Sequence, residues 1–406
     1  MRPVWLLALA ALGCRNILGI EEPLRVPDAD TSVTCMTWHP QGFDPCALGP
    51  PMPALHLKSG QYLYETTGTT AMAGGRLSAI LPDNTLHVLL QSTLAITQPD
   101  NSTVAVLSVD SLTVDAGATI SVMGVQPFLL VAWSTMAIEG TIDAGSRVPV
   151  AGVPHIGAGA NEGCATSAGN LGSTGGATGG SGGGGGGAFQ GAGGAGAHGV
   201  AASGGMGGGA LVPLVIRGGC QGGASGTAGT SVTVPAATYA PGGAGGGAIR
   251  LVAHDSITIE GSVGASGAGG SGAPLDSACG GGGGGSGGYV ALEAPAVTIG
   301  ANGAVAANGG GGGGGGGTLD AGNDGADGSI DLQAAPGGAV SSKGCGQPGG
   351  VGSAAGRLDG SDGTGAISGG CGGGGGGGGG AGFIAIASTG FTAPGSAKIS
   401  PPAMMQ

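Results

Sequence analysis

The chain has 406 residues, of which 102 are glycine, 8 % are charged and 3 % are aromatic, and its formal net charge is −12. Catalytic pockets and tight interfaces are built largely from charged and aromatic side chains, so their scarcity argues against an enzyme with a cofactor. Nucleic-acid binding needs clustered lysine and arginine, and the 11 basic residues of this chain form no cluster, so no nucleic-acid partner is predicted.

The first residues of the chain have the pattern of an export signal. Arg2 is followed by the apolar run 4–12, which is too short to cross a bilayer. The ending Ala-Leu-Gly-Cys, at residues 11–14, resembles the lipobox of bacterial lipoproteins, although that family usually has Leu in place of Ala11. The resemblance implies that residues 1–14 form a lipoprotein-type signal peptide and that Cys14 becomes the lipid-modified first residue.

The residue after the cysteine bears on the destination of the chain. Arg15 stands where an Asp would resemble an inner-membrane retention signal. The resemblance therefore implies a lipoprotein of the outer membrane or cell surface. Secretion of a protein with an incidental Cys14 is the alternative.

Residues 15–53 are rich in proline and acidic residues and are predicted to form a tether. An exported chain meets an oxidising compartment, so disulfides are expected, first between Cys35 and Cys46, which flank a short loop. Two further pairs are predicted within glycine-rich stretches: Cys164 with Cys220, and Cys345 with Cys371. This leaves Cys279, as a free thiol or within a different pairing. The chain has no C-x-x-C pair, so no metal site is predicted.

From residue 54 to 400 the sequence contains short apolar segments of alternating pattern, and one unit recurs. Each copy has two alternating apolar positions, a polar turn, two more apolar positions, a glycine and a final pair. The copies are residues 128–145, 248–267, 289–309 and 383–400, with a weaker copy at 329–344.

Three short strands in each unit of about 20 residues suit one coil of a parallel β-helix. One coil cannot bury its own apolar face, so several coils must stack. We predict a right-handed parallel β-helix of about five or six coils over residues 54–400, followed by a tail at 401–406. An antiparallel β-sandwich is the alternative, because alternation alone does not separate the two folds.

Tracts that are nearly pure Gly, Ala and Ser separate the units. They are predicted as inserts near residues 146–247, 268–288, 310–328 and 345–382. The cost of closing a loop grows only with the logarithm of its length, so one corner of each coil can accept inserts of different lengths. Flexible coil is favoured over extended polyglycine helices packed side by side, because glycine loses the most entropy when it is ordered.

Few side chains suggest chemistry. The Asp-Gly motifs at 323–328 and 359–363 are similar to Ca²⁺-binding repeats, but neither is tandem, so solvated turns are predicted. Glu139 and Glu260 hold the same place in two units, where paired carboxylates would suit glycoside chemistry. The third unit has Gly300 at that place, so both are interpreted as outward-facing residues.

Over about residues 128–400, the repeats separated by polyglycine tracts resemble glycine-rich bacterial cell-surface proteins, including PGRS-type repeat proteins and β-helical adhesins. The chain lacks the helical N-terminal domain of the mycobacterial PGRS proteins. The resemblance implies a structural or adhesive surface protein, with a membrane partner through the lipid and with envelope or extracellular polysaccharide or protein as further partners. A polysaccharide-binding or polysaccharide-active β-helix is the alternative. These families offer no active site to carry over.

Overall fold

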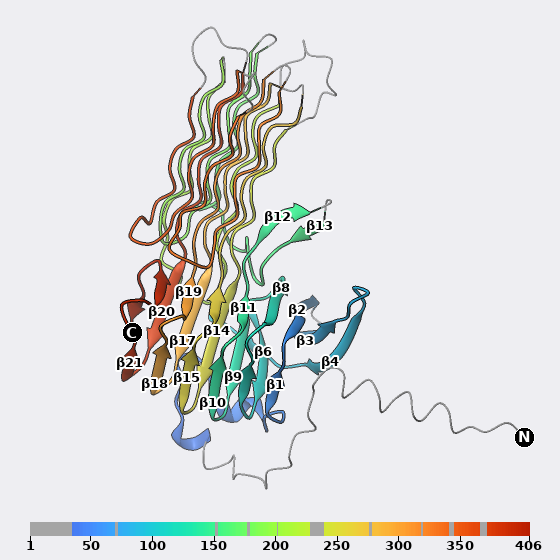
Figure 1. Ribbon diagram of the computed structural model, residues 1–406, viewed down its shortest axis with the longest axis vertical. Coiled ribbons are helices and arrows are strands. Elements are labelled where there is room, and N and C mark those ends of the chain that lie inside the picture. Colours follow the sequence, from blue (N-terminus) through green and yellow to red (C-terminus); the bar gives the residue numbers. More distant parts are fainter. Residues whose placement is uncertain are drawn as a thin grey trace, which may run out of the picture.

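The computed structural model describes residues 35–69, 72–150, 153–176, 179–200, 202–227, 239–275, 278–317, 320–340, 345–365 and 372–406. Figure 1 shows a parallel β-helix continued by a bundle of extended glycine-rich segments, and segments of the bundle run directly into strands such as β14, β17 and β20. The predicted export signal and Cys14 lie outside the described residues.

The predicted parallel β-helix is confirmed. Three largely parallel sheets each receive one strand from every complete coil. The first strand of each coil lies in sheet A, the second in sheet B and the third in sheet C. In chain order these coils are β6 (Thr103–Val109), β7 (Leu112–Val114) and β8 (Ala118–Gly124); β9 (Phe128–Ala132), β10 (Thr135–Ile138) and β11 (Thr141–Asp143); β14 (Ala248–Ala253), β15 (Ser256–Ile259) and β16 (Ser262–Gly264); β17 (Tyr289–Glu293), β18 (Ala296–Ile299) and β19 (Ala304–Ala306); and β20 (Phe383–Ala387), β21 (Gly390–Thr392) and β22 (Lys398–Ser400).

The remaining strands lie at the ends and edges of these sheets. A partial coil precedes the complete ones, one strand follows them, and the β2–β3–β4 meander extends sheet C by antiparallel pairing. They are β1 (Leu55–Leu57), β2 (Gly60–Thr69), β3 (Met72–Ile80), β4 (Leu86–Ser92), β5 (Ala95–Thr97), which pairs with β6, the hairpin of β12 (Arg147–Val150) with β13 (Val153–His155), and β23 (Met404–Met405).

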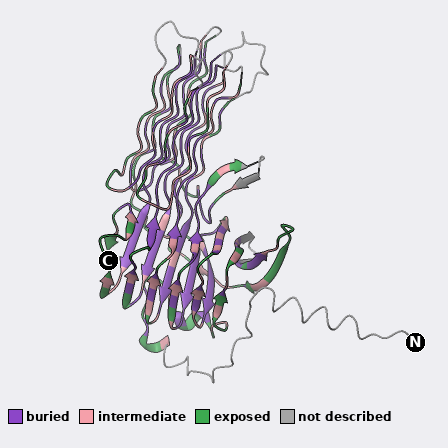
Figure 2. Ribbon diagram, in the orientation of Figure 1, coloured by how far each residue is buried: buried purple, intermediate pink, exposed green. Residues whose placement is uncertain are grey.

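Register in the sheets stacks equivalent aliphatic side chains from coil to coil. In sheet B, Val114 pairs with Ile138, Ile138 with Ile259, and Ile259 with Ile299. Each of the four is at most 1 % exposed. Full burial of such a side chain contributes about 1.5–3 kcal/mol, so each coil is stabilised mainly by the coils above and below it. Figure 2 shows the resulting band of buried residues along the strands.

The segment before the β-helix packs against the outer face of sheet A. Residues 35–48, predicted as part of the tether, include the 3-10 helix η1 (Pro45–Leu48). Trp38 is buried with its ring edge-on to Trp133 at a centroid distance of 5.6 Å. The Arg250 guanidinium donates to the carbonyl oxygen of Gln41 at 2.6 Å. Residues 35–48 of the predicted tether therefore pack on sheet A and cover part of its outer face.

The inserts leave and rejoin the β-helix at one corner. They follow the sheet C strands β11, β16 and β19 and end where the sheet A strands β14, β17 and β20 begin. The weak unit predicted at 329–344 is wrong as a coil, because its described part, 329–340, forms no strand. The Ile330 side chain packs beside Gly264 on sheet C, and the Gly338 amide bonds to an insert segment. The predicted inserts near 310–328 and 345–382 are thus parts of one insert between β19 and β20.

The described insert residues are ordered, so the prediction of flexible coil is wrong. Successive N–H groups of segment 181–188 donate to three different neighbours in a three-residue repeat. Ser181, Gly184 and Gly187, for example, donate to segment 278–284 at 2.9–3.1 Å. Three residues per turn is the repeat of the polyproline II helix, which has no hydrogen bonds of its own. Six neighbours therefore satisfy the backbone of this segment, three as acceptors and three as donors: segments 167–173, 194–197 and 278–284 accept, and segments 205–208, 223–226 and 374–380 donate.

We call this bundle the glycine array. The proportion of glycine in each segment depends on whether the segment lies in the interior or at the edge of the array. Segments with neighbours on all sides contain the longest glycine runs: 182–187, 280–285, 309–317 and 372–380. A Cβ atom built on Gly283 would lie 1.9 Å from the carbonyl oxygen of Gly185. Segment 168–175 lies at the edge, and only every third residue faces inward: Gly169, Gly172 and Gly175. The ordering cost of glycine is therefore offset by contacts that no other residue permits.

We predict that Gly283→Ala lowers the free energy of unfolding by at least about 1–3 kcal/mol, because its Cβ would overlap backbone that cannot move independently. The measurement is chemical denaturation of the purified chain. Gly356→Ala is the matched control, since its Cβ would meet nothing within 4 Å, and it should change stability by less than about 0.5 kcal/mol. Equal stability of the two variants would contradict this account of the array.

Candidate functional site

Two of the predicted cysteine pairs are disulfides in the structure: Cys35–Cys46 and Cys164–Cys220. Disulfides persist in oxidising compartments, so they indicate an extracytoplasmic protein. Cys345 is also disulfide-bonded, while Cys371, its predicted partner, lies outside the described residues. Cys279 is buried within the glycine array. Among the described residues, no helix has the length and apolar character needed to span a membrane.

Arg217 organises the base of the glycine array around the second disulfide. Its guanidinium lies 3.2 Å from the sulfur atoms of both Cys164 and Cys220 and 5.6 Å from the centre of the Phe189 ring. It also donates to the carbonyl oxygen of Gly163 at 2.9 Å. Burial lowers the pKa of Arg217, and the nearby Asp100 and Glu162 oppose that shift. These contacts give the charge a structural role.

The Asp-Gly motifs lie in extended edge segments of the array and cap its edges, so the predicted turns are wrong, whereas Asp324, Asp359 and Asp362 are exposed as predicted. Asp359 and Asp362 accept hydrogen bonds from the amides of Ala192 and Ala195 at 2.8 and 2.7 Å. The three-residue spacing of the two aspartates matches the repeat of the neighbouring helix. The other motif acts likewise: Asp324 accepts from Gly272, and Asp327 from Gly269 and Val148. Among the described residues, no group of three His, Cys, Asp or Glu is placed to hold a metal ion.

Glu139 and Glu260 lie in exposed turns after β10 and β15. Gly300, at the equivalent place in the next coil, leaves room for the neighbouring glutamate, since a Cβ there would lie 2.1 Å from an Oε atom of Glu260. Neither glutamate lines the pocket described next.

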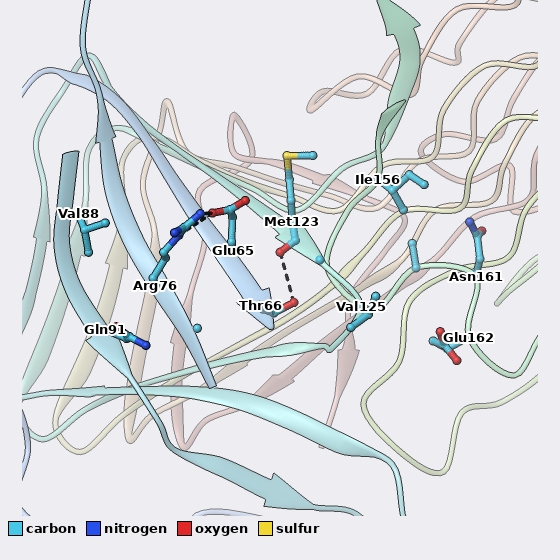
Figure 3. Close-up of a pocket in the computed structure, with 13 residues that line it drawn as sticks. Glu65, Thr66, Arg76, Val88, Gln91, Met123, Val125, Ile156, Asn161 and Glu162 are labelled. Atoms are coloured by element: carbon cyan, nitrogen blue, oxygen red, sulfur yellow. Dashed lines mark hydrogen bonds and ion pairs between the residues drawn. The ribbon is translucent and has the colours of Figure 1, made fainter. Parts of the chain in front are cut away.

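An open pocket of about 710 Å³ lies between the β2–β3–β4 meander and the base of the glycine array (Figure 3). Glu65 and Arg76 form a cross-strand ion pair at 2.6 Å on its wall. Its other described side chains carry hydroxyl, amide, carboxyl, thioether and aliphatic groups, and none of these described residues is aromatic: Thr66, Val88, Gln91, Met123, Val125, Ile156, Ala160, Asn161 and Glu162. The described lining residues include no serine, cysteine or histidine, so they supply no nucleophile–histidine pair.

His155, in the β12–β13 hairpin, is the histidine with the clearest electrostatic signature. Its Nε2 atom is buried without a hydrogen-bond partner. Burial lowers the pKa of His155, Arg147 adds to that effect, and Asp143 and Asp327 oppose it. The neutral imidazole is therefore favoured in the folded chain.

Comparison with known proteins finds no matching family model, no matching curated protein and no matching solved structure. Sequence reasoning missed the pocket, and it named the packed polyglycine helices of the array only as the alternative to flexible coil. The pocket joins strands and an insert that are far apart in the chain. The array did leave a signal, since uninterrupted glycine runs alternate with glycine at every third residue.

Removing an edge cap should loosen the array locally. Asp362→Ala leaves the Ala195 amide without its acceptor, and we expect faster hydrogen exchange at that amide with a stability loss of about 0.5–1.5 kcal/mol. Asp362→Asn keeps an oxygen acceptor and is the control. Unchanged exchange in the alanine variant would show that the carboxylate does not cap the segment.

Stability should fall as the pH drops below the ordinary histidine pKa of about 6.5, because the unfolded chain then binds a proton at His155 more readily than the folded chain. Chemical denaturation at a series of pH values measures this dependence. His155→Phe removes the titrating group, so its stability should vary less between neutral and mildly acidic pH. If the variant shows the same dependence as the parent, other groups cause it.

Proposed function

We propose that this chain is an exported, non-catalytic surface protein with a structural or adhesive role, held at the outer membrane by a lipid on Cys14. The observation that carries the proposal is the glycine array. Its interior is fixed by backbone hydrogen bonds, so the outward positions of its edge segments are free to vary without loss of the fold. A rigid platform with interchangeable surface residues suits contact with envelope, matrix or other cells.

The disulfides support an extracytoplasmic location for this platform. The edge residues support a contact role over a catalytic one. Leu171 and Thr174 occupy exposed positions three residues apart on one edge segment, and the Thr174 hydroxyl lies 3.1 Å from that of Thr227 on its neighbour. Such spacing presents side chains at intervals of one helical turn, about 9.3 Å.

A polysaccharide-binding role is the second candidate, and the open pocket beside Glu65 and Arg76 supports it. Its described lining residues include no aromatic ring, although aromatic faces supply much of the contact area in ligand sites. We therefore favour the adhesive or structural role.

The anchor is tested by the mass of the N-terminal peptide of the mature protein from membrane fractions. We expect a lipid-modified Cys14, and we expect Cys14→Ser to abolish both the modification and recovery in the outer-membrane fraction, because thioether formation needs the thiol. Arg15→Lys, which keeps the thiol and the charge, is the control. An unmodified Cys14 in the native protein would remove the anchor from the proposal.

Adhesion is tested separately with cells that lack the protein. Surface attachment and envelope integrity are expected to be impaired and to be restored by the native chain. Unchanged attachment and envelope together would leave a secreted or polysaccharide-directed role as the better explanation.

A further inference from the structure

Four of the five most exposed large apolar side chains of the described residues lie in one part of the glycine array. Leu214 is 95 % exposed, Val212 78 %, Leu171 70 % and Met206 69 %. These four belong to two adjacent edge segments of the glycine array and to the loop 210–216 that follows them. We call them the apolar edge. Exposed apolar side chains gathered on neighbouring segments are typical of an interaction surface.

Hydrogen bonds link the members of the apolar edge. The Asn170 amide donates to the Met206 carbonyl oxygen at 2.9 Å, which places the segment of Leu171 beside that of Met206. The Gly209 amide donates to Thr166 at 3.1 Å just before loop 210–216 begins. The loop therefore continues the same edge toward the β-helix.

The loop is fastened at both ends. The Leu211 amide donates to the Phe189 carbonyl oxygen at 2.8 Å. At the other end, the Gln98 side chain accepts from the Ile216 amide at 2.7 Å and donates to its carbonyl oxygen at 2.9 Å. Val212 and Leu214 are thus presented to solvent by a fixed backbone, which lowers the entropy cost of binding through them.

Charge is absent from this part of the sequence. From Gly163 to Ile216 there is no Asp, Glu, Lys or Arg, although the chain as a whole carries a net charge of −12. Moving a surface into a less polar medium is costly when it carries ions and favourable when it carries exposed aliphatic groups. The apolar edge carries exposed aliphatic groups and no charge of its own, and Arg217, Asp100 and Glu162 lie beyond its end nearest the β-helix.

The apolar edge lies on the side of the molecule where the described chain begins. Ile216 packs against the same outer cluster of sheet A as Trp38 and Cys35. Met36, in this docked segment, is itself 72 % exposed. The 20 residues between Cys14 and Cys35 span at most about 70 Å when fully extended, so a lipid on Cys14 would hold this side within reach of the bilayer.

We propose that the apolar edge lies in the headgroup region of the bilayer that holds the Cys14 lipid. This inference rests on the proposed lipid anchor, which supplies the membrane, while the edge supplies a second contact that orients the molecule on it. Acyl anchors bind more firmly when a second membrane signal accompanies them. The lipid then tethers the chain and the edge fixes which face of the array points outward.

The test uses residues 15–406, which contain every described residue and lack both the export segment and the lipid. Flotation with vesicles of phosphatidylethanolamine and phosphatidylglycerol measures binding. We expect this chain to float with the vesicles and Val212→Ser/Leu214→Ser to reduce the bound fraction at least about tenfold. Leu275→Ser/Leu332→Ser is the control, because it removes two exposed apolar side chains elsewhere, outside the pocket, and should bind as the parent does.

Three results would overturn the inference. The first is no flotation of the parent chain, and the second is equal flotation of the two double variants. The third is concentration-dependent self-association that disappears in Val212→Ser/Leu214→Ser, which would assign the edge to a second copy of the chain. The mass of the native N-terminus tests the anchor independently. If the native protein is lipid-modified but residues 15–406 do not bind vesicles, the proposed function stands and this inference is wrong.

Discussion

The array depends on how closely one backbone can approach another when no Cβ atom stands between them. A carbonyl oxygen lies about 2 Å from the place where a Cβ would be added to most interior glycines, for example 2.0 Å at Gly285 and 1.9 Å at Gly186. At that separation each extended helix exchanges hydrogen bonds with all its neighbours. The interior of this part of the protein is therefore held by peptide groups, whereas most protein interiors are held by side chains.

The β-helix supplies the template that this packing needs. An isolated polyglycine helix has no internal hydrogen bonds, so nothing would offset the conformational entropy that it loses on ordering. Here the paired strands hold the ends of neighbouring glycine segments in register. The amides of Tyr289 and Phe383, which begin β17 and β20, donate to the carbonyl oxygens of Gly247 and Gly288 on the neighbouring segments at 2.9 and 2.8 Å. The aliphatic ladders of the coils thus set the spacing at which the glycine segments meet.

Sequence reasoning succeeded where a local pattern decides the structure. Alternation in units such as 248–267 gave the three strands of a coil, and proximity within a stretch gave the Cys164–Cys220 pair. It failed where the outcome depends on several segments at once. The entropy lost on ordering favours flexible coil for a single glycine run on its own. Segment 181–188 is nevertheless ordered, because it bonds to six other segments that lie up to about 200 residues away in the sequence. The pattern of residues 329–344 likewise matched a coil weakly, and contacts in the array outweighed it.

The three-residue repeat of the array limits how its segments can change in length during evolution. Adding or removing three residues in an edge segment keeps every inward glycine and every aspartate cap in phase, whereas adding one or two would turn side chains into the interior. Glycine triplets are thus units by which the array can lengthen, and an in-frame duplication of nine nucleotides, encoding three residues, supplies one such unit. Related chains should therefore differ in insert length by multiples of three.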